Sequence, residues 1–267
     1  MEEIKFLYED FTWEEVREVV RENRVVLQPV GSIEQHGPHL ALKTDIMIAR
    51  AFCVEAGRRT PSEVIVMPSI PYGFNAHHMD FPGTISVDGE TFINFVLCVM
   101  KSLVTHGFRK ILLVNGHGSN NPFLDIVARR TIIETEALCG TCMPYSLIRE
   151  CIAEKSECQW NSHACEIETS LLMYLSPQDV RVEKITKEIG FPISKYHWRS
   201  LTKASPLNMM DIWSRISETG IAGDPTLASK EKGKEIFEAG VENLIELVKE
   251  FRAREIAPRK DHHRKDM

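Results

Sequence analysis

A carboxylate and an imidazole lie two residues apart in an early polar loop, at Glu34 and His36. The loop follows Val25 to Leu27, an apolar β-branched run without helical period, which predicts a buried strand. In an extended backbone, residues i and i+2 point the same way, so the two side chains can converge on one point. A second carboxylate, Asp45, opens the next apolar helical pattern, where together with Thr44 it could also cap the helix. Three such groups after one buried strand favour a metal or catalytic site over unrelated roles.

A second polar loop carries a residue of the same kind. His117 follows the apolar segment Lys110 to Asn115, which is the clearest central strand of the sequence. Strands alternate with helical patterns along the chain, which predicts an α/β fold with a mostly parallel sheet flanked by helices on both faces. In such sheets, binding sites form outside the carboxyl ends of the strands. We therefore expect His117 to meet Glu34 and His36 at one edge of the sheet.

A third segment, His163-Ala-Cys-Glu-Ile-Glu-Thr, contains His163, Glu166 and Glu168. Its histidine could carry a proton, stabilise an oxyanion or cap the helix. The two glutamates are two residues apart, about 200° around a helix, so they cannot both face one metal ion. His163 and Glu168 are also well separated in angle unless the helix begins near Glu166. Spacing alone leaves the choice between the two glutamates open.

Three carboxylates and two histidines are enough to hold two divalent ions about 3.5–4 Å apart that share one carboxylate. Carboxylate and imidazole ligands suit Zn, Mn or Fe(II) rather than Cu(I) or an iron–sulfur cluster. Such a pair of ions supplies hydroxide from a bridging water near pH 7 and polarises a carbonyl, so the predicted reaction is metal-assisted hydrolysis. The sequence has no G-x-S-x-G elbow and no P-loop, and its Gly116-His-Gly118 lacks the third glycine of a dinucleotide fingerprint.

The remaining pattern supplies the elements that position these groups. The long irregular segment Tyr72 to Ser86 carries the adjacent histidines His77 and His78 and has the length of a functional loop. Residues 179–219 show no clear pattern. Helices are predicted over residues 13–21, 45–58, 87–105, 163–175 and 230–254 and after a cap at Asn121, and strands over 25–27, 64–67, 110–115 and 142–147.

Bulk composition narrows the class of protein. With 267 residues, of which 43% are hydrophobic, the chain can bury one large core, and we expect a single domain over residues 1–258 with a solvated tail at 259–267. A net charge of −6 argues against a nucleic-acid partner. No apolar run approaches the roughly 18 residues that span a bilayer, and the first residues show no signal peptide. Seven cysteines scattered along the chain, most of them in apolar segments, are typical of a reducing cytoplasm.

Five motifs, in order along the chain, resemble those of the creatininase family of metal-dependent amidohydrolases. Each motif alone is modest, but together they extend over nearly the whole chain. They are Pro29-Val-Gly-Ser-Ile-Glu-Gln-His-Gly-Pro-His-Leu with Thr44-Asp45, His78-x-x-Phe81-Pro-Gly-Thr-Ile-Ser, Val114-Asn-Gly-His-Gly-Ser-Asn120, His163-Ala-x-Glu-x-Glu-Thr-Ser and Gly220-x-x-Gly-Asp-Pro-Thr-Leu.

The resemblance implies a three-layer α/β fold, commonly assembled as a hexamer, with two bound divalent ions. One ion would be held by Glu34, Asp45 and His117. The second would be held by His36, the shared Asp45 and Glu168.

The same resemblance implies roles for residues around the ions. His163 would face the substrate near the attacked carbon, His78 would line the pocket, and Glu166 would support a neighbour or cap its helix. Ser119, which we also expect to contact substrate, replaces a carboxylate that creatininase itself has two residues after the metal-binding histidine. Creatinine is therefore not the expected substrate.

Three interpretations follow. The leading one is hydrolysis of a C–N bond in a small amide, such as a cyclic amide or a formamide, by a metal-bridged hydroxide, with His163 passing a proton to the leaving nitrogen. The second keeps the metals but opens a cyclic ketone, such as a keto-inositol, by C–C hydrolysis. The third is a non-catalytic member of the family.

Overall fold

The structure is a computed structural model, and it describes residues 4–263. Four parallel strands form its sheet in the order β2-β1-β3-β4, namely β1 (Val25–Val30), β2 (Val64–Val66), β3 (Lys110–Asn115) and β4 (Leu138–Cys142). The register pairs Val30 with Asn115, so the two central strands end at the same level. The loops that follow β1 and β3 therefore leave the sheet side by side.

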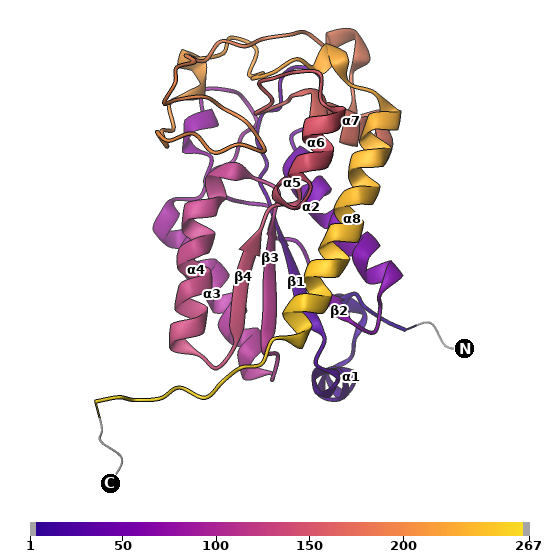
Figure 1. Ribbon diagram of the computed structural model, residues 1–267, viewed down its shortest axis with the longest axis vertical. Coiled ribbons are helices and arrows are strands. Elements are labelled where there is room, and N and C mark those ends of the chain that lie inside the picture. Colours follow the sequence, from indigo (N-terminus) through magenta and orange to yellow (C-terminus); the bar gives the residue numbers. More distant parts are fainter. Residues whose placement is uncertain (1–3, 264–267) are drawn as a thin grey trace.

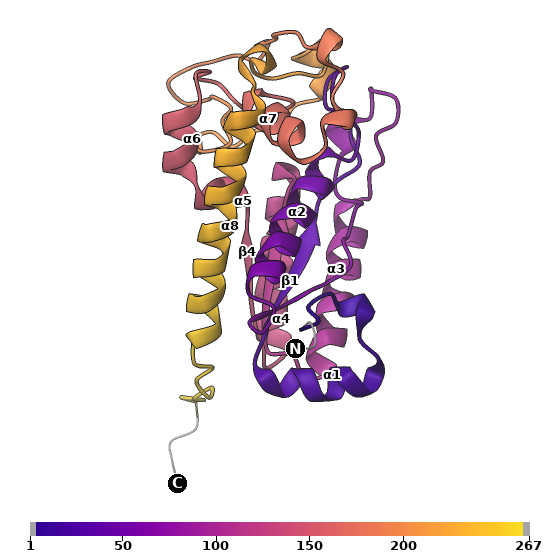
Figure 2. The same cartoon turned by 90° about the vertical axis from the view of Figure 1, so that its right-hand side faces the viewer.

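Helices cover both faces of the sheet, because alternate strand residues are apolar on either side (Figures 1 and 2). On one face, Val25 and Leu27 pack in a core with α2 (Thr44–Arg59), α7 (Glu166–Leu175) and α8 (Lys230–Ala253). On the other, Val26 and Val30 pack with α3 (Gly89–Thr105) and α4 (Asn121–Glu134). The predicted fold class is confirmed.

The shorter elements lie at the two ends of the sheet. Helix α1 (Trp13–Val19) precedes β1, and α5 (Pro144–Leu147) and α6 (Arg149–Lys155) follow β4. Residues 179–219, which we call the cap segment, contain only short 3-10 turns and cross above the carboxyl ends of the strands (Figure 1). The cap segment is thus placed over the edge of the sheet where the polar loops meet.

Two predicted elements differ from the observed ones. A strand over residues 142–147 is wrong: the strand is Leu138–Cys142, and Pro144 opens a short helix, as expected of a residue with no N–H and a fixed φ. The helix predicted from His163 begins only at Glu166, because Ala164 takes a left-handed φ of 49° and His163 pairs with Ala222 instead.

Two predicted helix caps are also wrong. The N-cap of α4 is Asn120, one residue before Asn121. The N-cap of α2 is Lys43, and Thr44 donates its hydroxyl to the carbonyl of Ala41, so neither Thr44 nor Asp45 caps that helix. Asp45 lies in the first turn, with its carboxylate free for another role.

Part of the predicted tail lies outside the described residues. Residues 259–263 are exposed, and 264–267 are not among the residues that the structure describes. Within 4–263, no helix combines the length and the apolar character needed to cross a membrane.

Candidate metal centre

The end of the central sheet brings three separate segments together. The loop after β1 carries Glu34 and His36, the first turn of α2 carries Asp45, and His117 follows β3. The close approach depends on Gly116, since a Cβ there would lie 2.2 Å from the carbonyl oxygen of Asp45.

The carboxylate of Asp45 faces two imidazoles, one with each oxygen. Oδ1 lies 3.0 Å from Nε2 of His36, and Oδ2 lies 3.0 Å from Nδ1 of His117. Ser32 donates its hydroxyl to Oδ2 at 2.7 Å, which fixes the orientation of the carboxylate. Asp45 is only 2% exposed. This is the arrangement required of a carboxylate that bridges two cations.

Backbone carbonyls orient the two imidazoles. His36 donates Nδ1–H to the carbonyl of Glu34 at 3.2 Å, and His117 donates Nε2–H to the carbonyl of Phe74 at 3.2 Å. A carbonyl can only accept, so the other nitrogen of each neutral ring presents a lone pair toward Asp45. A lone pair cannot rest 3.0 Å from a carboxylate oxygen without a proton or a metal ion between them.

The surroundings of Glu34 also fit a bound cation. The side chain is fully buried, and neither carboxylate oxygen accepts a hydrogen bond from the described residues. Oε2 lies 3.1 Å from Nδ1 of His117, and Oε1 lies 3.6 Å from both Nε2 of His78 and Nδ1 of His163. A buried carboxylate without hydrogen bonds is costly unless a cation neutralises it. The residues present therefore fit a divalent metal ion.

Three groups of side chains, among those described, have ligand atoms within 4.8 Å of one another. They are Glu34–Asp45–His117, His36–His163–Glu168 and Glu34–His78–His163. The first matches the predicted first ion. The second contains two of the predicted ligands of the second ion and adds His163. All of these ligand atoms are oxygen or nitrogen, as Zn, Mn and Fe(II) accept.

Protons occupy the imidazoles when no cation is bound. Burial by itself lowers the pKa of His36, but the carboxylate of Asp45 outweighs it and raises that pKa to about 9. Burial is likewise outweighed at His117, where Glu34 and Asp45 raise the pKa to about 10. Burial raises the pKa of Glu168 to about 7. A divalent ion must displace these protons in order to bind.

We expect the metal-free protein to lose stability as the pH rises, and the metal-loaded protein to keep it. The folded-state pKa values of His36 and His117 lie above the ordinary value near 6.5, so their contribution is complete below about pH 6.5 and is lost toward about pH 9–10. Metal binding should tighten over the same range and release protons. Melting temperatures with and without EDTA, and calorimetry in two buffers, measure both effects. A metal-free melting temperature that rises with pH would contradict this charge assignment.

The two glutamates of α7 lie in different surroundings. Glu168 belongs to one of the three groups that could hold a metal ion, whereas Glu166 forms an ion pair with Lys232 and accepts hydrogen bonds from Ser156 and the backbone of Cys158. Because the helix begins at Glu166, the turn at Ala164 lets His163 and Glu168 reach the same place.

The remaining predicted residues line the space around the ligands. His78 is 1% exposed, and its Nδ1 accepts from the side chain of Gln35 at 2.8 Å. Ser119 contacts Nε2 of His77 at 3.0 Å rather than a metal ligand. The sequence analysis missed Gln35 and left His77 without a role, although both are neighbours of predicted residues.

Trp213, from the cap segment, was also missed. Its ring stacks on His78 with centroids 4.5 Å apart and meets His163 edge-on at 4.9 Å. No sequence pattern relates the cap segment to these histidines, so only the fold reveals the contact.

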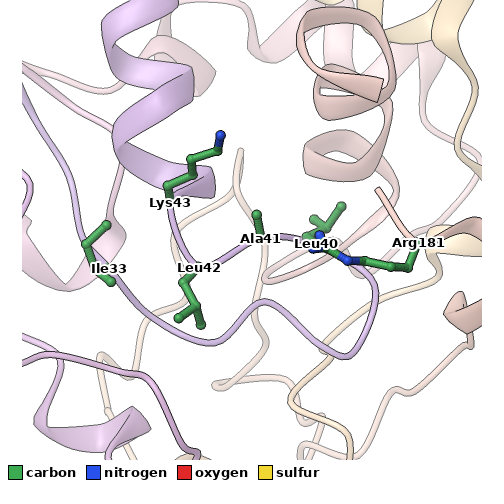
Figure 3. A pocket seen from close by; sticks show the side chains of 6 residues that line it. All are labelled: Ile33, Leu40, Ala41, Leu42, Lys43 and Arg181. Carbon is green, nitrogen blue, oxygen red and sulfur yellow. The ribbon is translucent and has the colours of Figure 1, made fainter. Parts of the chain in front are cut away.

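A surface pocket of about 370 Å³ lies beside the loop that carries Glu34 and His36 (Figure 3). None of the metal-ligand residues lines it. Its lining consists of Ile33, Leu40, Ala41, Leu42, Lys43 and Arg181.

Fold and ligand set together define a class of protein, a metal-dependent hydrolase built on a parallel α/β sheet. A family model described as creatininase, creatinine amidohydrolase, matches residues 9–248. The chain belongs to the creatininase family.

Three relatives illustrate the range of that family. The chain is 30% identical over 231 residues to a mycofactocin precursor peptide peptidase of Mycolicibacterium smegmatis, with 85% of each chain covered. It is 28% identical over 270 residues to a 3-dehydro-scyllo-inosose hydrolase of Thermotoga maritima, covering 92% of this chain and 84% of the relative. A solved structure described as creatininase Mn superposes with a TM-score of 0.76 at 25% identity, covering 92% of this chain and 98% of the other. Creatininase-family membership and these named hydrolases make the protein an enzyme that acts with divalent metal.

Proposed function

We propose that this protein hydrolyses a C–N bond in a small amide, a cyclic amide or a formamide, with two divalent ions that share Asp45. One observation carries the proposal: the two oxygens of Asp45 each lie 3.0 Å from an imidazole nitrogen, and the other nitrogen of each ring lies 3.2 Å from a backbone carbonyl, so each ring in its neutral form presents a lone pair toward Asp45. One cation at each contact relieves both conflicts at once. Glu34 and His117 would complete the first set of ligands, and His36 and Glu168 the second.

Ions held in this way lower the pKa of water and polarise a carbonyl group. Proton transfer is carried out by a side chain of the protein, His163. His163 donates Nε2–H to the carbonyl of Gln35 at 2.7 Å, which leaves Nδ1 facing the ligands as a proton acceptor. Burial lowers the pKa of His163, so the ring is neutral at pH 7 and can take up a proton and pass it to the leaving nitrogen.

The walls above the ligands exclude water. His78 and Trp213 stack against each other, and Trp213 donates its Nε1–H to the carbonyl of Gly220 at 2.8 Å, which holds the ring in place. Gln35 also donates to Gly220, at 3.1 Å, and so ties the metal-binding loop to the segment after the cap. An enclosed site of this kind strengthens the polar interactions that stabilise a developing oxyanion.

C–C hydrolysis of a cyclic ketone is the second candidate function. It is favoured by the similarity to the Thermotoga maritima relative, whose name describes the hydrolysis of an inosose. The same ligands would polarise a ketone in place of an amide. The identity of the ions, assembly as a hexamer and a cytoplasmic location stay predictions.

Elemental analysis followed by a substrate panel tests the proposal. We expect the purified protein to contain Zn, Mn or Fe, and the metal-loaded protein to release amine from a formamide or lactam but not to open cyclic ketones. EDTA should abolish the activity, and added metal should restore it. A protein that carries no metal, or that turns over only the cyclic ketones, would contradict amide hydrolysis.

A further inference from the structure

The guanidinium of Arg199 lies in the cap segment without an anionic partner. It sits over the ring of Trp213 with Cζ 4.8 Å from the centroid, and its Nε is buried without a hydrogen bond. Among the described residues, no ion pair or hydrogen bond to Arg199 is formed. The acid that acts on it electrostatically, Asp211, is instead paired with Arg215 at 3.1 Å.

Trp213 connects this arginine to the metal centre. The same ring that carries Arg199 stacks on His78 and meets His163 edge-on, with centroids 4.5 Å and 4.9 Å away. It also meets His77 at 6.1 Å, and Nδ1 of His77 is a second buried polar atom without a hydrogen bond. Arg199 and His77, each with a buried nitrogen that lacks a hydrogen bond, therefore both contact Trp213, and the same ring contacts His78 and His163 at the site.

Arg199 is partly buried, and its Nε is a buried donor of a charged group, which is costly unless an acceptor pairs with it. Burial accordingly lowers the pKa of Arg199. The planar fork of arginine donors matches a carboxylate and binds it through two parallel hydrogen bonds. The cation–π contact with Trp213 restrains the position of the guanidinium before any anion arrives.

We propose that Arg199 binds a carboxylate of the substrate, so that the enzyme acts on amides that carry a carboxylate near the scissile bond. This inference rests on the proposed function for the position of the bond. The charge is expected from the substrate because, among the described residues, none forms an ion pair with the guanidinium, and the nearby Asp211 is paired with Arg215. Arg199 is then a specificity residue, and the metal centre performs the same chemistry on any amide that this contact holds in place.

Binding measurements on the metal-loaded protein separate Arg199 from the metals. The probes are levulinate, a keto acid with no amide to hydrolyse, and its neutral counterpart in which a hydroxymethyl group replaces the carboxylate. We expect Arg199→Gln to weaken levulinate binding by about 10- to 100-fold, the loss typical of a charge-assisted hydrogen-bonded pair. Binding of the neutral probe should not change. Arg199→Lys keeps the charge but loses the pair of parallel donors, so its affinity for levulinate should lie between those of the wild type and Arg199→Gln.

Lys195→Gln is the matched control, since Lys195 is an exposed cation of the same cap segment, and it should leave both affinities unchanged. Metal content and circular dichroism must match the wild type in each variant. Equal levulinate affinity in wild type and Arg199→Gln would overturn the proposal, because the ions alone would then hold the carboxylate. An equal loss for both probes would overturn it in favour of a structural role for Arg199. All of these measurements are binding affinities and none requires turnover. The test of Arg199 therefore stays valid even if the protein hydrolyses no amide in the substrate panel.

Discussion

Replacing Asp45 by alanine is expected to remove both metal ions and nearly all hydrolase activity. Each of the two carboxylate oxygens of Asp45 lies 3.0 Å from the nitrogen of a different imidazole, that of His36 or that of His117. Its loss takes a ligand from both ions and leaves Glu34 buried beside fewer positive charges. Turnover should fall at least about 10³-fold, which corresponds to about 4 kcal/mol of lost transition-state stabilisation. Elemental analysis and turnover of the substrate that the panel identifies measure the two effects.

Two further variants make this result specific. Asp45→Asn keeps the shape of the side chain and an oxygen for the hydroxyl of Ser32, but it removes the charge, so it should lose metal as well. Asp125→Ala removes an exposed carboxylate from α4 and should retain wild-type metal content. An Asp45→Ala protein that keeps both ions would show that the shared carboxylate is assigned to the wrong residue.

The sequence predicted the part of the site that depends on strand ends. β1 and β3 are buried throughout and mostly apolar, and both lead into glycine-containing loops, so the carboxyl-end rule was enough to bring Glu34, His36 and His117 together. The helical pattern after Asp45 placed that carboxylate in a first turn, although its interpretation as a cap was wrong. Local pattern and global fold agree here, which is why the prediction succeeded.

The sequence could not predict the part of the site that depends on long-range packing. Residues 179–219 lack regular structure, and Trp213 and Arg199 reach the site only because the cap segment crosses the edge of the sheet. The strand β4 was also predicted too late in the sequence, at residues 142–147. That segment is as apolar as a strand, and only Pro144 opposes the assignment. Irregular segments are positioned by tertiary contacts that leave no periodic signal.

The choice between Glu166 and Glu168 was open for a similar reason. It depends on where α7 begins, and that start is set by the left-handed turn at Ala164 and by the pairing of His163 with Ala222, some sixty residues away in sequence. Helix spacing alone could not supply either contact. Alanine variants of the two glutamates, Glu166 and Glu168, therefore test where the structure begins α7.

Glu168→Ala is expected to lose metal and activity, whereas Glu166→Ala should keep metal and lose stability. Glu168 has a ligand atom within 4.8 Å of those of His36 and His163, and its removal takes a ligand from one ion. Glu166 is fully buried and forms an ion pair with Lys232, so its removal leaves the mostly buried ammonium group with only the exposed Glu157 as an anionic partner. Breaking such a pair costs about 3–5 kcal/mol of the free energy of unfolding. Elemental analysis and denaturant unfolding separate the two outcomes.

Lys232→Met provides the matched control for the stability effect, because it removes the other member of the same pair. It should also destabilise the protein, although less than Glu166→Ala does, and likewise leave the metal content unchanged. The carboxylate of Glu166 also accepts hydrogen bonds from the backbone N–H groups of Glu157 and Cys158. These two N–H groups lose their acceptor only in Glu166→Ala, so that variant should be the less stable of the two. If Glu166→Ala loses metal while Glu168→Ala retains it, the second ion has the other glutamate as its ligand, and the turn at Ala164 does not orient α7 as the structure has it.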